Sequence, residues 1–326
     1  MKLYRIHEHG GPMSLRLEAG EVPKPGPGEI LIRHTAVGVN FSDVQASVGG
    51  SVYASMPLPI TPGVEGAGEI VAVGPDVTGC APGDIVAYPD QHGAYAEQRV
   101  VPASSIIPVP PGLDTPTAVA VLTSGMTAHI LAHEVHPGLR AGDTALVHAG
   151  AGAVTLLLIP MLKRLGVHVV TTVSTAEKAE IATTAGADQA INYQDHDFVA
   201  LVREATDGRG VDVVFDGVGA TTFEGSLACL RPRGYMIMFG EASGPPPMFA
   251  PAALGRGGSL FLTRMLLPFF IDTPADRQRI GSAVLESALD GRLAMPPCQD
   301  YAFDRAPEAL ARLQDRATVG KMILRF

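Results

Sequence analysis

The stretch Val147–Thr155, VHAGAGAVT, decides how the second half of this chain folds. It follows the apolar run TALV and precedes a segment of helix length, so it occupies the turn between a strand and a helix. Gly150 and Gly152 match the first two glycines of the pattern G-x-G-x-x-G, while Thr155 stands at the third. The first two glycines serve the tight turn and the approach of backbone to a pyrophosphate, and the third only helps the helix pack. The stretch therefore predicts a dinucleotide-binding loop inside a β-α-β unit.

On both sides of this loop, apolar runs of strand length alternate with segments of helix length. Such alternation is typical of right-handed β-α-β crossovers and predicts a parallel, doubly wound sheet over residues 123–265. The expected strands lie at 144–149, 167–173, 190–193, 211–216, 234–240 and 259–263, and the expected helices after the loop lie at 176–185, 198–206 and 223–230.

The first part of the chain has a different pattern. Short alternating stretches such as EILIRHTAV and GEIVAVG are separated by clusters of Pro, Gly and Asp, which favours an antiparallel barrel or a strongly curled sheet. After residue 265 the sequence predicts helices at 276–289 and 307–316 and a final strand, GKMILRF, a tail too short to fold alone. We therefore expect one domain from residues 1–122 and 266–326, and a second from residues 123–265.

Composition narrows the classes of function. There are 24 Lys and Arg against 33 Asp and Glu, a net charge of −9 that repels nucleic acid phosphates. The three cysteines are widely spaced and fit neither a disulfide framework nor a thiolate zinc site, which predicts a reducing, cytoplasmic location. No signal peptide pattern begins the sequence, and no apolar run reaches the roughly 20 residues that span a bilayer. We expect no membrane and no nucleic acid partner.

The residues after the second strand of the dinucleotide unit select the cofactor. An NAD site places a carboxylate there to bind the ribose hydroxyls, whereas this chain has Ser174 and Thr175, with Lys178 one helical turn later. Hydroxyl and ammonium donors suit a 2′-phosphate, so the sequence predicts NADPH. Ser174 is also expected to cap the following helix. The neighbouring Glu177 argues against NADPH, because a carboxylate would repel the 2′-phosphate.

Two segments of the first domain, GVNFSD (38–43) and TPGVEGAGEIVAVG (61–74), resemble the medium-chain dehydrogenase/reductase superfamily. The resemblance extends along the chain through GDIVA, AEQRVVPA, the glycine loop, FDGVG, FGEASG and the terminal GK. It implies an α/β protein with a GroES-like β-barrel catalytic domain and a Rossmann domain. In the zinc enzymes of this superfamily a Cys and a His of these segments bind metal, but here Asn40 and Val64 stand in their places. Amide and isopropyl groups cannot replace those ligands, so we expect no metal.

The combination NFxD, HAGAG, STAEK, INY and FGxASG resembles the zinc-independent quinone oxidoreductases, the zeta-crystallin-like branch. Asn40, Asp43 and Tyr53 would face the nicotinamide and substrate, with Asn40 the candidate catalytic residue. Asp43 as a simple turn cap is the alternative. The chain departs from the branch at Gln45 and Ser47 after NFxD, and at Glu241 in place of a common Asn. By this resemblance the cofactor would contact Thr127, Gly150, Ala151, Gly152, Ala153, Val154, Ser174, Lys178, Tyr193, Val218, Phe239, Gly240, Thr263, Arg264 and Lys321.

The expected activity is direct hydride transfer from NADPH to a quinone without a metal. Two alternatives stay open: reduction of the C=C bond of an α,β-unsaturated carbonyl, which uses the same geometry, and an NADPH-binding structural or sensor protein without turnover. The departures from the branch at Gln45 and Ser47 support the first alternative, because they would enlarge or neutralise the substrate pocket. The run SLFLT (Ser259–Thr263) would end the Rossmann sheet as an exposed apolar edge, which predicts a homodimer.

Overall fold

The computed structural model describes the backbone of residues 1–326 and the side chains of all of them except residues 51 and 52. The chain forms two compact units, residues 1–126 with 267–326 and residues 127–266. The first boundary between the units follows Met126, whereas the sequence predicts it after residue 122. Both positions lie inside the long helix α2 (Thr115–His133), which runs from one unit into the other.

The first unit is built on a curled, mostly antiparallel sheet with the strand order β14-β15-β3-β4-β5-β7, and β6 also pairs with β3. The central strand β3 (Glu29–Val39) changes register against β4 at two points, which bends the sheet. The last strand of the chain, β15 (Lys321–Arg325), pairs antiparallel with β3 and so returns the C-terminal segment to this unit. The other elements are the strands β1 (Lys2–Ile6), β2 (Leu15–Ala19), β4 (Gly66–Val73), β5 (Ile85–Tyr88), β6 (Gln98–Pro102), β7 (Ile107–Pro108) and β14 (Cys298–Ala302), and the helices α1 (Phe41–Val48), α8 (Pro274–Leu289) and α9 (Ala306–Gln314).

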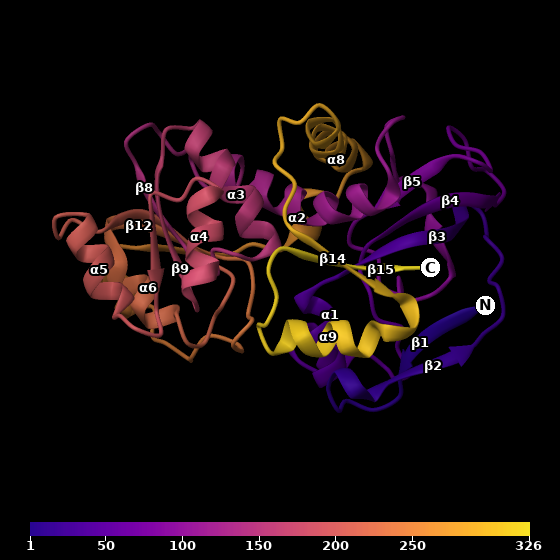
Figure 1. Ribbon diagram of the computed structural model, residues 1–326, viewed down its shortest axis with the longest axis horizontal. Coiled ribbons are helices and arrows are strands. Elements are labelled where there is room, and N and C mark those ends of the chain that lie inside the picture. Colours follow the sequence, from indigo (N-terminus) through magenta and orange to yellow (C-terminus); the bar gives the residue numbers. More distant parts are fainter. The chain divides into compact units, whose positions relative to one another are not determined.

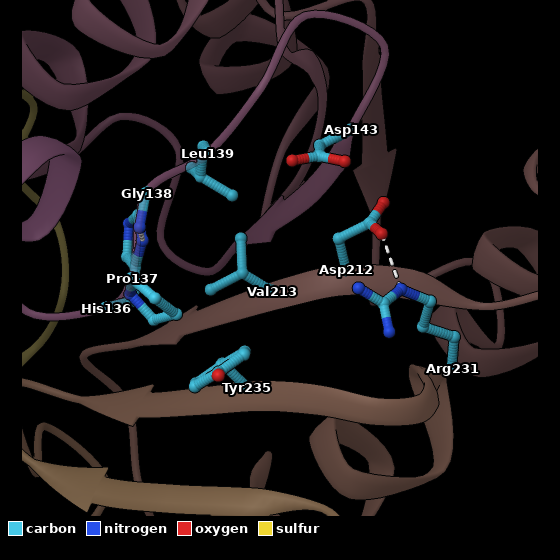
Figure 2. A pocket seen from close by; sticks show the side chains of 9 residues that line it. All are labelled: His136, Pro137, Gly138, Leu139, Asp143, Asp212, Val213, Arg231 and Tyr235. Carbon is cyan, nitrogen blue, oxygen red and sulfur yellow. Dashed lines mark hydrogen bonds and ion pairs between the residues drawn. The ribbon is translucent and has the colours of Figure 1, made fainter.

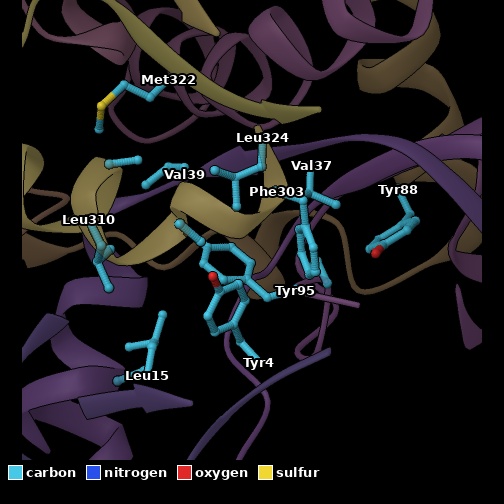
Figure 3. Close-up of a cluster of buried hydrophobic side chains, with 14 of the residues drawn as sticks. Tyr4, Leu15, Val37, Val39, Tyr88, Tyr95, Phe303, Leu310, Met322 and Leu324 are labelled. Atoms are coloured by element: carbon cyan, nitrogen blue, oxygen red, sulfur yellow. The ribbon is translucent and has the colours of Figure 1, made fainter. Parts of the chain in front are cut away.

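The core of this unit fills the space between the sheet and the helices α1 and α9. Tyr4 and Phe303 meet edge to face with their ring centroids 5.3 Å apart, and Tyr95 is fully buried in the same cluster (Figure 3). Val37 and Val39, at the end of β3, point into this cluster, and Val44 of α1 packs there as well. The apolar packing therefore fixes the turn between β3 and α1, which carries Asn40 and Asp43.

The second unit is a doubly wound parallel sheet with the strand order β10-β9-β8-β11-β12-β13. Every neighbouring pair is parallel, as the alternation in the sequence predicts. Helices α3 and α4 cover one face of the sheet, and α5 and α6 cover the other (Figure 1). The strands are β8 (Thr144–Val147), β9 (His168–Val173), β10 (Gln189–Asn192), β11 (Val211–Asp216), β12 (Leu230–Met238) and β13 (Phe261–Arg264), and the helices are α3 (Ala153–Arg164), α4 (Ala176–Thr184), α5 (Phe198–Ala205), α6 (Phe223–Cys229) and α7 (Ala252–Arg256).

The order of the strands reverses between β8 and β11, because the chain first adds β9 and β10 on one side and later β12 and β13 on the other. Ligands of open α/β sheets bind at such a switch point, outside the carboxyl ends of the strands. We therefore expect a ligand to bind at the loops that follow β8, β9, β11 and β12. Among the described residues, no helix is both long and apolar enough to cross a membrane.

Candidate functional site

The glycine loop lies at the N-terminus of α3, between β8 and the helix. A Cβ atom at Gly150 would lie 2.5 Å from the Thr171 hydroxyl oxygen, so only glycine fits there without displacing β9. Gly152 is the N-cap residue of α3 and no side chain caps the helix, so the backbone donors of the first turn are left for a ligand. Thr155, at the third glycine position, is buried and its hydroxyl donates to the His148 carbonyl at 3.4 Å. The larger residue is thus accommodated by a hydrogen bond to the strand end.

The residues expected to select the cofactor meet at one corner of the sheet. Ser174 follows the last residue of β9, and its hydroxyl accepts from the Lys178 ammonium at 3.4 Å. The backbone N–H of Tyr193, after β10, donates to the carbonyl of Val173 at 3.0 Å, which places Tyr193 beside this pair. Hydroxyl and ammonium groups therefore lie together at the carboxyl end of β9.

One expectation about this corner is wrong. The N-cap of α4 is Thr175, whose side chain accepts from the backbone N–H of Lys178 at 3.2 Å, and Ser174 does not cap the helix. A cap at Ser174 would start the helix at Thr175, but the helix starts at Ala176. Thr175 has the extended backbone that an N-cap residue adopts. The Ser174 hydroxyl is therefore not committed to the helix.

The loops after β11 and β12 approach each other closely. A Cβ atom at Gly240 would lie 2.5 Å from the Gly217 carbonyl, and one at Gly217 would lie 2.8 Å from the Phe239 ring. Val218, Phe239 and Gly240 are all partly exposed on these loops. The end of the next strand adds Arg264, whose guanidinium lies 3.4 Å from the Glu241 carboxylate.

The structure thus brings most of the expected nucleotide residues to one edge of the second unit, since the carboxyl ends of parallel strands meet there. Thr127 lies on α2 and is half-buried, and the Tyr193 side chain is 38% exposed at the end of an edge strand. Lys321 belongs to the first unit, where its side chain is 1% exposed. The residues at the common edge are Gly150, Ala151, Gly152, Ala153, Val154, Ser174, Lys178, Tyr193, Val218, Phe239, Gly240, Thr263 and Arg264.

The first unit contains a buried polar cluster made of Asn40, Glu65 and Lys321, here called the Asn40 cluster. The Lys321 ammonium donates to the Asn40 side-chain oxygen at 2.7 Å and also to a Glu65 carboxylate oxygen. The Asn40 side-chain nitrogen donates to the same Glu65 oxygen at 2.7 Å. The amide is oriented by these partners, because its oxygen must face the ammonium and its nitrogen the carboxylate. Asn40 is the partly exposed member, while the other two are 1% exposed.

Asp43 extends this cluster into the core. One carboxylate oxygen accepts from the backbone N–H of Asn40 at 2.8 Å and from the Tyr95 hydroxyl at 3.1 Å. The other oxygen is buried and has no hydrogen-bond partner among the described residues. Burial raises the pKa of the Asp43 carboxyl to about 7, against the two hydrogen bonds, which lower it. Asp43 therefore caps the N-terminus of α1, which is the alternative role that the sequence left open for it. It is also a buried titratable group.

Tyr53 contacts His92 and not the three residues of the Asn40 cluster. Its hydroxyl is 3.5 Å from a ring nitrogen of His92, and the two rings meet edge to face at 5.4 Å between centroids. Burial raises the pKa of Tyr53 and lowers the pKa of His92, so both side chains are neutral near pH 7. Tyr53 is only 5% exposed, so the structure places its side chain in the core of the first unit.

Sequence reasoning missed Glu65 and assigned Lys321 to the nucleotide alone. The acidic residue stands in the quoted segment TPGVEG, but a charged residue gives no sign of its partner when the two are 256 positions apart. In the part of the chain that the structure describes, no group of three or more His, Cys, Asp or Glu side chains is arranged to hold a metal ion.

Replacing Asp43 by asparagine is expected to change how stability depends on pH. The folded-state pKa, about 7, lies above the ordinary value of 3.8, so this group stabilises the folded state below pH 3.8 and that contribution is lost as pH rises through about 7. The variant D43N cannot ionise, so its Tm relative to the wild type should be higher at pH 8 than at pH 4. Calorimetry across this range measures the difference, with the exposed Asp76→Asn as the matched control. Parallel curves for D43N and the wild type would contradict the assignment.

Comparison with protein families gives two matches along the chain. The alcohol dehydrogenase GroES-like domain family matches residues 26–111, and the zinc-binding dehydrogenase family matches residues 153–267. The first match falls in the first unit, and the second match falls in the second unit except for its last residue.

Several proteins resemble the chain over its full length. A quinone oxidoreductase of Pseudomonas aeruginosa is 38% identical over 324 residues, which are 99% of each chain. A 2-haloacrylate reductase of a Burkholderia species is 37% identical over 325 residues, 98% of this chain and 97% of the relative. The crystal structure of Escherichia coli quinone oxidoreductase complexed with NADPH has a TM-score of 0.95 and 32% identity, and the match covers 100% of both chains.

Proposed function

Since this chain belongs to the quinone oxidoreductase family of the medium-chain dehydrogenase/reductase superfamily, we propose that it uses NADPH to reduce a quinone by direct hydride transfer, without a metal. The family membership rests on full-length identity above 30% to a named quinone oxidoreductase. The two-domain architecture, a GroES-like unit and a Rossmann unit, agrees with it. We also propose roles for individual residues.

The residues of the second unit fit NADPH. The uncapped N-terminus of α3 suits a pyrophosphate, and Gly150 lets the turn before this helix pack closely against Thr171 of β9. Ser174 and Lys178 supply a hydroxyl and an ammonium for the 2′-phosphate, and no carboxylate stands at the end of β9 to bind an unmodified ribose. Val218, Phe239 and Gly240 line the same edge, where the rest of the nucleotide would lie.

The first unit supplies the acceptor side. Bound NADPH provides the hydride, and the chain must orient the acceptor and stabilise the negative charge that develops on its oxygen. One N–H of the Asn40 amide donates to Glu65, which leaves the second N–H for an acceptor carbonyl. Lys321 holds the amide oxygen and adds positive charge behind it. The proton that completes the reduction comes from water in this account.

The single observation that carries the proposal is the Asn40 cluster, since the Glu65–Lys321 ion pair fixes an amide whose second N–H is left for an acceptor carbonyl. Steady-state oxidation of NADPH tests it, with 9,10-phenanthrenequinone and 1,4-benzoquinone as acceptors. Turnover with these quinones is the expected result. Tight binding of NADPH without turnover on any acceptor would instead favour a structural or sensor protein.

A second acceptor class is favoured by the 37% identity to a 2-haloacrylate reductase. That relative's name describes reduction of an activated C=C bond, which uses the same hydride geometry. Including 2-hexenal and crotonyl-CoA in the panel separates the two classes. Quinone turnover faster than enone turnover supports the first proposal, and the reverse order supports the second.

We further propose that the protein forms a homodimer through β13. This strand is the edge of the parallel sheet, Phe261 is 50% exposed on it, and its ring stacks on Tyr235 of β12 at 4.6 Å between centroids. An exposed apolar edge pairs readily with a second copy of itself. Sedimentation should return a dimer at micromolar concentration, and Phe261→Lys should weaken it. A wild-type protein that sediments as a monomer would contradict this proposal.

A further inference from the structure

A continuous set of buried hydrogen bonds lies beneath the loops that follow β8 and β11, and the proposed chemistry does not use it. The set, here called the Asp216 network, runs from Thr172 on β9 through His148 and Ser226 to Asp216, the last residue of β11. The side chains of His148, Ser226 and Asp216 are fully buried, and Thr172 is 2% exposed. Groups as polar as these are buried only where their partners are fixed.

The donor and acceptor of each hydrogen bond in the network follow from Asp216, whose oxygen accepts from the Ser226 hydroxyl. The Ser226 hydroxyl donates to an Asp216 oxygen at 2.8 Å, so it accepts from the His148 Nε2 hydrogen at 3.0 Å. His148 Nδ1 then accepts from the Thr172 hydroxyl at 2.8 Å. Burial lowers the pKa of His148, which agrees with a neutral ring carrying its hydrogen on Nε2.

The three side-chain types are those of a nucleophilic triad, but their order is not. In a triad the histidine lies between serine and aspartate, whereas here Ser226 lies between His148 and Asp216. Ser226 is also fully buried, so no substrate can reach its oxygen. The network therefore holds structure in place.

What it holds is the loop after β11. Asp216 accepts from the backbone N–H of Val218 at 2.8 Å and of Gly219 at 3.0 Å, and the Thr222 hydroxyl donates to the same carboxylate. Gly219 has a φ of +90°, and a Cβ atom there would lie 2.4 Å from the Gly244 carbonyl. The carboxylate thus fixes a turn that only glycine can make.

The constraint reaches the neighbouring loops. The backbone N–H of Ser243, after β12, donates to the Val218 carbonyl at 2.7 Å, and Ala220 donates to Gly244 at 3.0 Å. On the other side, the Gly150 N–H donates to the Thr172 carbonyl at 2.9 Å. The network therefore connects the loops on both sides of the switch point between β8 and β11.

We infer that Asp216, Ser226 and His148 are positioning residues for the nucleotide: together they fix the loops after β8 and β11 in the arrangement that binds NADPH. The inference rests on the proposed function for the identity of the nucleotide. It adds three buried residues that touch neither cofactor nor acceptor but determine how tightly the cofactor binds.

The test compares Asp216→Ala with Asp212→Ala, a matched control on the same strand. Asp212 is 6% exposed at the opposite end of β11, where it pairs with Arg231 beside a small pocket (Figure 2). Both substitutions remove a buried, hydrogen-bonded carboxylate, so both should lower the Tm of the nucleotide-free protein. Only D216A is expected to weaken NADPH binding, raising its Kd about tenfold or more in calorimetric titration. An equal rise in both variants, or an unchanged Kd in D216A, would overturn the inference.

Two milder variants keep the test decisive if D216A fails to fold. Asp216→Asn retains one oxygen for the two backbone donors and an amide that the two hydroxyls can accept from, so it should restore most of the affinity that D216A loses. Ser226→Ala separates His148 from the carboxylate and should raise the KM for NADPH several-fold with kcat little changed. NADPH affinity in S226A equal to the wild type, or in D216N as poor as in D216A, would contradict the inference. A wild-type protein that does not bind NADPH would overturn the proposed function as well, so the two failures are distinguishable.

Discussion

Replacing Lys321 by methionine is expected to destabilise the folded protein by about 3–5 kcal/mol, because it leaves the Glu65 carboxylate buried without a countercharge. Both side chains are 1% exposed, and the second carboxylate oxygen already has no hydrogen-bond partner among the described residues. Methionine has nearly the same length as the lysine stem, so packing changes little. Thermal unfolding of K321M, compared with the wild type at pH 7, measures the loss.

Two further variants show whether burial of the charge is the cause. Lys163→Met removes an ammonium from the Lys163–Asp188 ion pair, whose side chains are 34% and 27% exposed, and should cost only about 0–1 kcal/mol. Adding Glu65→Gln to K321M removes the uncompensated charge and should recover most of the lost stability. A Tm for K321M close to that of K163M would contradict the account of the Asn40 cluster.

Changing Ser174 to aspartate together with Lys178 to alanine is expected to reverse the choice of cofactor. The double variant loses a hydroxyl and an ammonium donor and places a carboxylate where the 2′-phosphate would lie. We expect kcat/KM for NADPH to fall about a hundredfold or more. NADH should improve, because the new carboxylate can accept from the ribose hydroxyls. Initial rates with both cofactors and one quinone measure the exchange.

The matched control is Glu180→Gln, two residues from Lys178 on the same helix. Because it changes an exposed charge outside the expected phosphate contact, its effect should stay within about threefold for both cofactors. If the double variant keeps the wild-type preference for NADPH, the 2′-phosphate does not lie at this corner.

The fold class was predictable because its signals are local. The glycine loop, the alternation of apolar runs with helix-length segments and the turn-rich first part each depend on residues close in sequence, and the fold class that they predict is confirmed. The end of β9 at Val173 lies where the sequence predicts it, directly before Ser174. Its cap was wrong by one residue, since the end of a helix depends on backbone angles that sequence specifies poorly.

The polar interior was not predictable in the same way. In the Asn40 cluster, Asn40 directly follows β3, Glu65 directly precedes β4 and Lys321 begins β15, 281 positions from Asn40. His148 and Asp216 stand in quoted motifs, but nothing in those motifs indicates that Ser226 joins them. Such groups become partners only when the sheet order is known, because burial and pairing are properties of the folded chain.

The proposed function depends on hydride transfer from NADPH to the acceptor without a metal. The most direct measurement is the rate of NADPH oxidation by 9,10-phenanthrenequinone with protein dialysed against a chelator, with its zinc content determined on the same sample. An unchanged rate and no stoichiometric zinc are expected. A rate that is lost on chelation and restored by added zinc would contradict the proposed function.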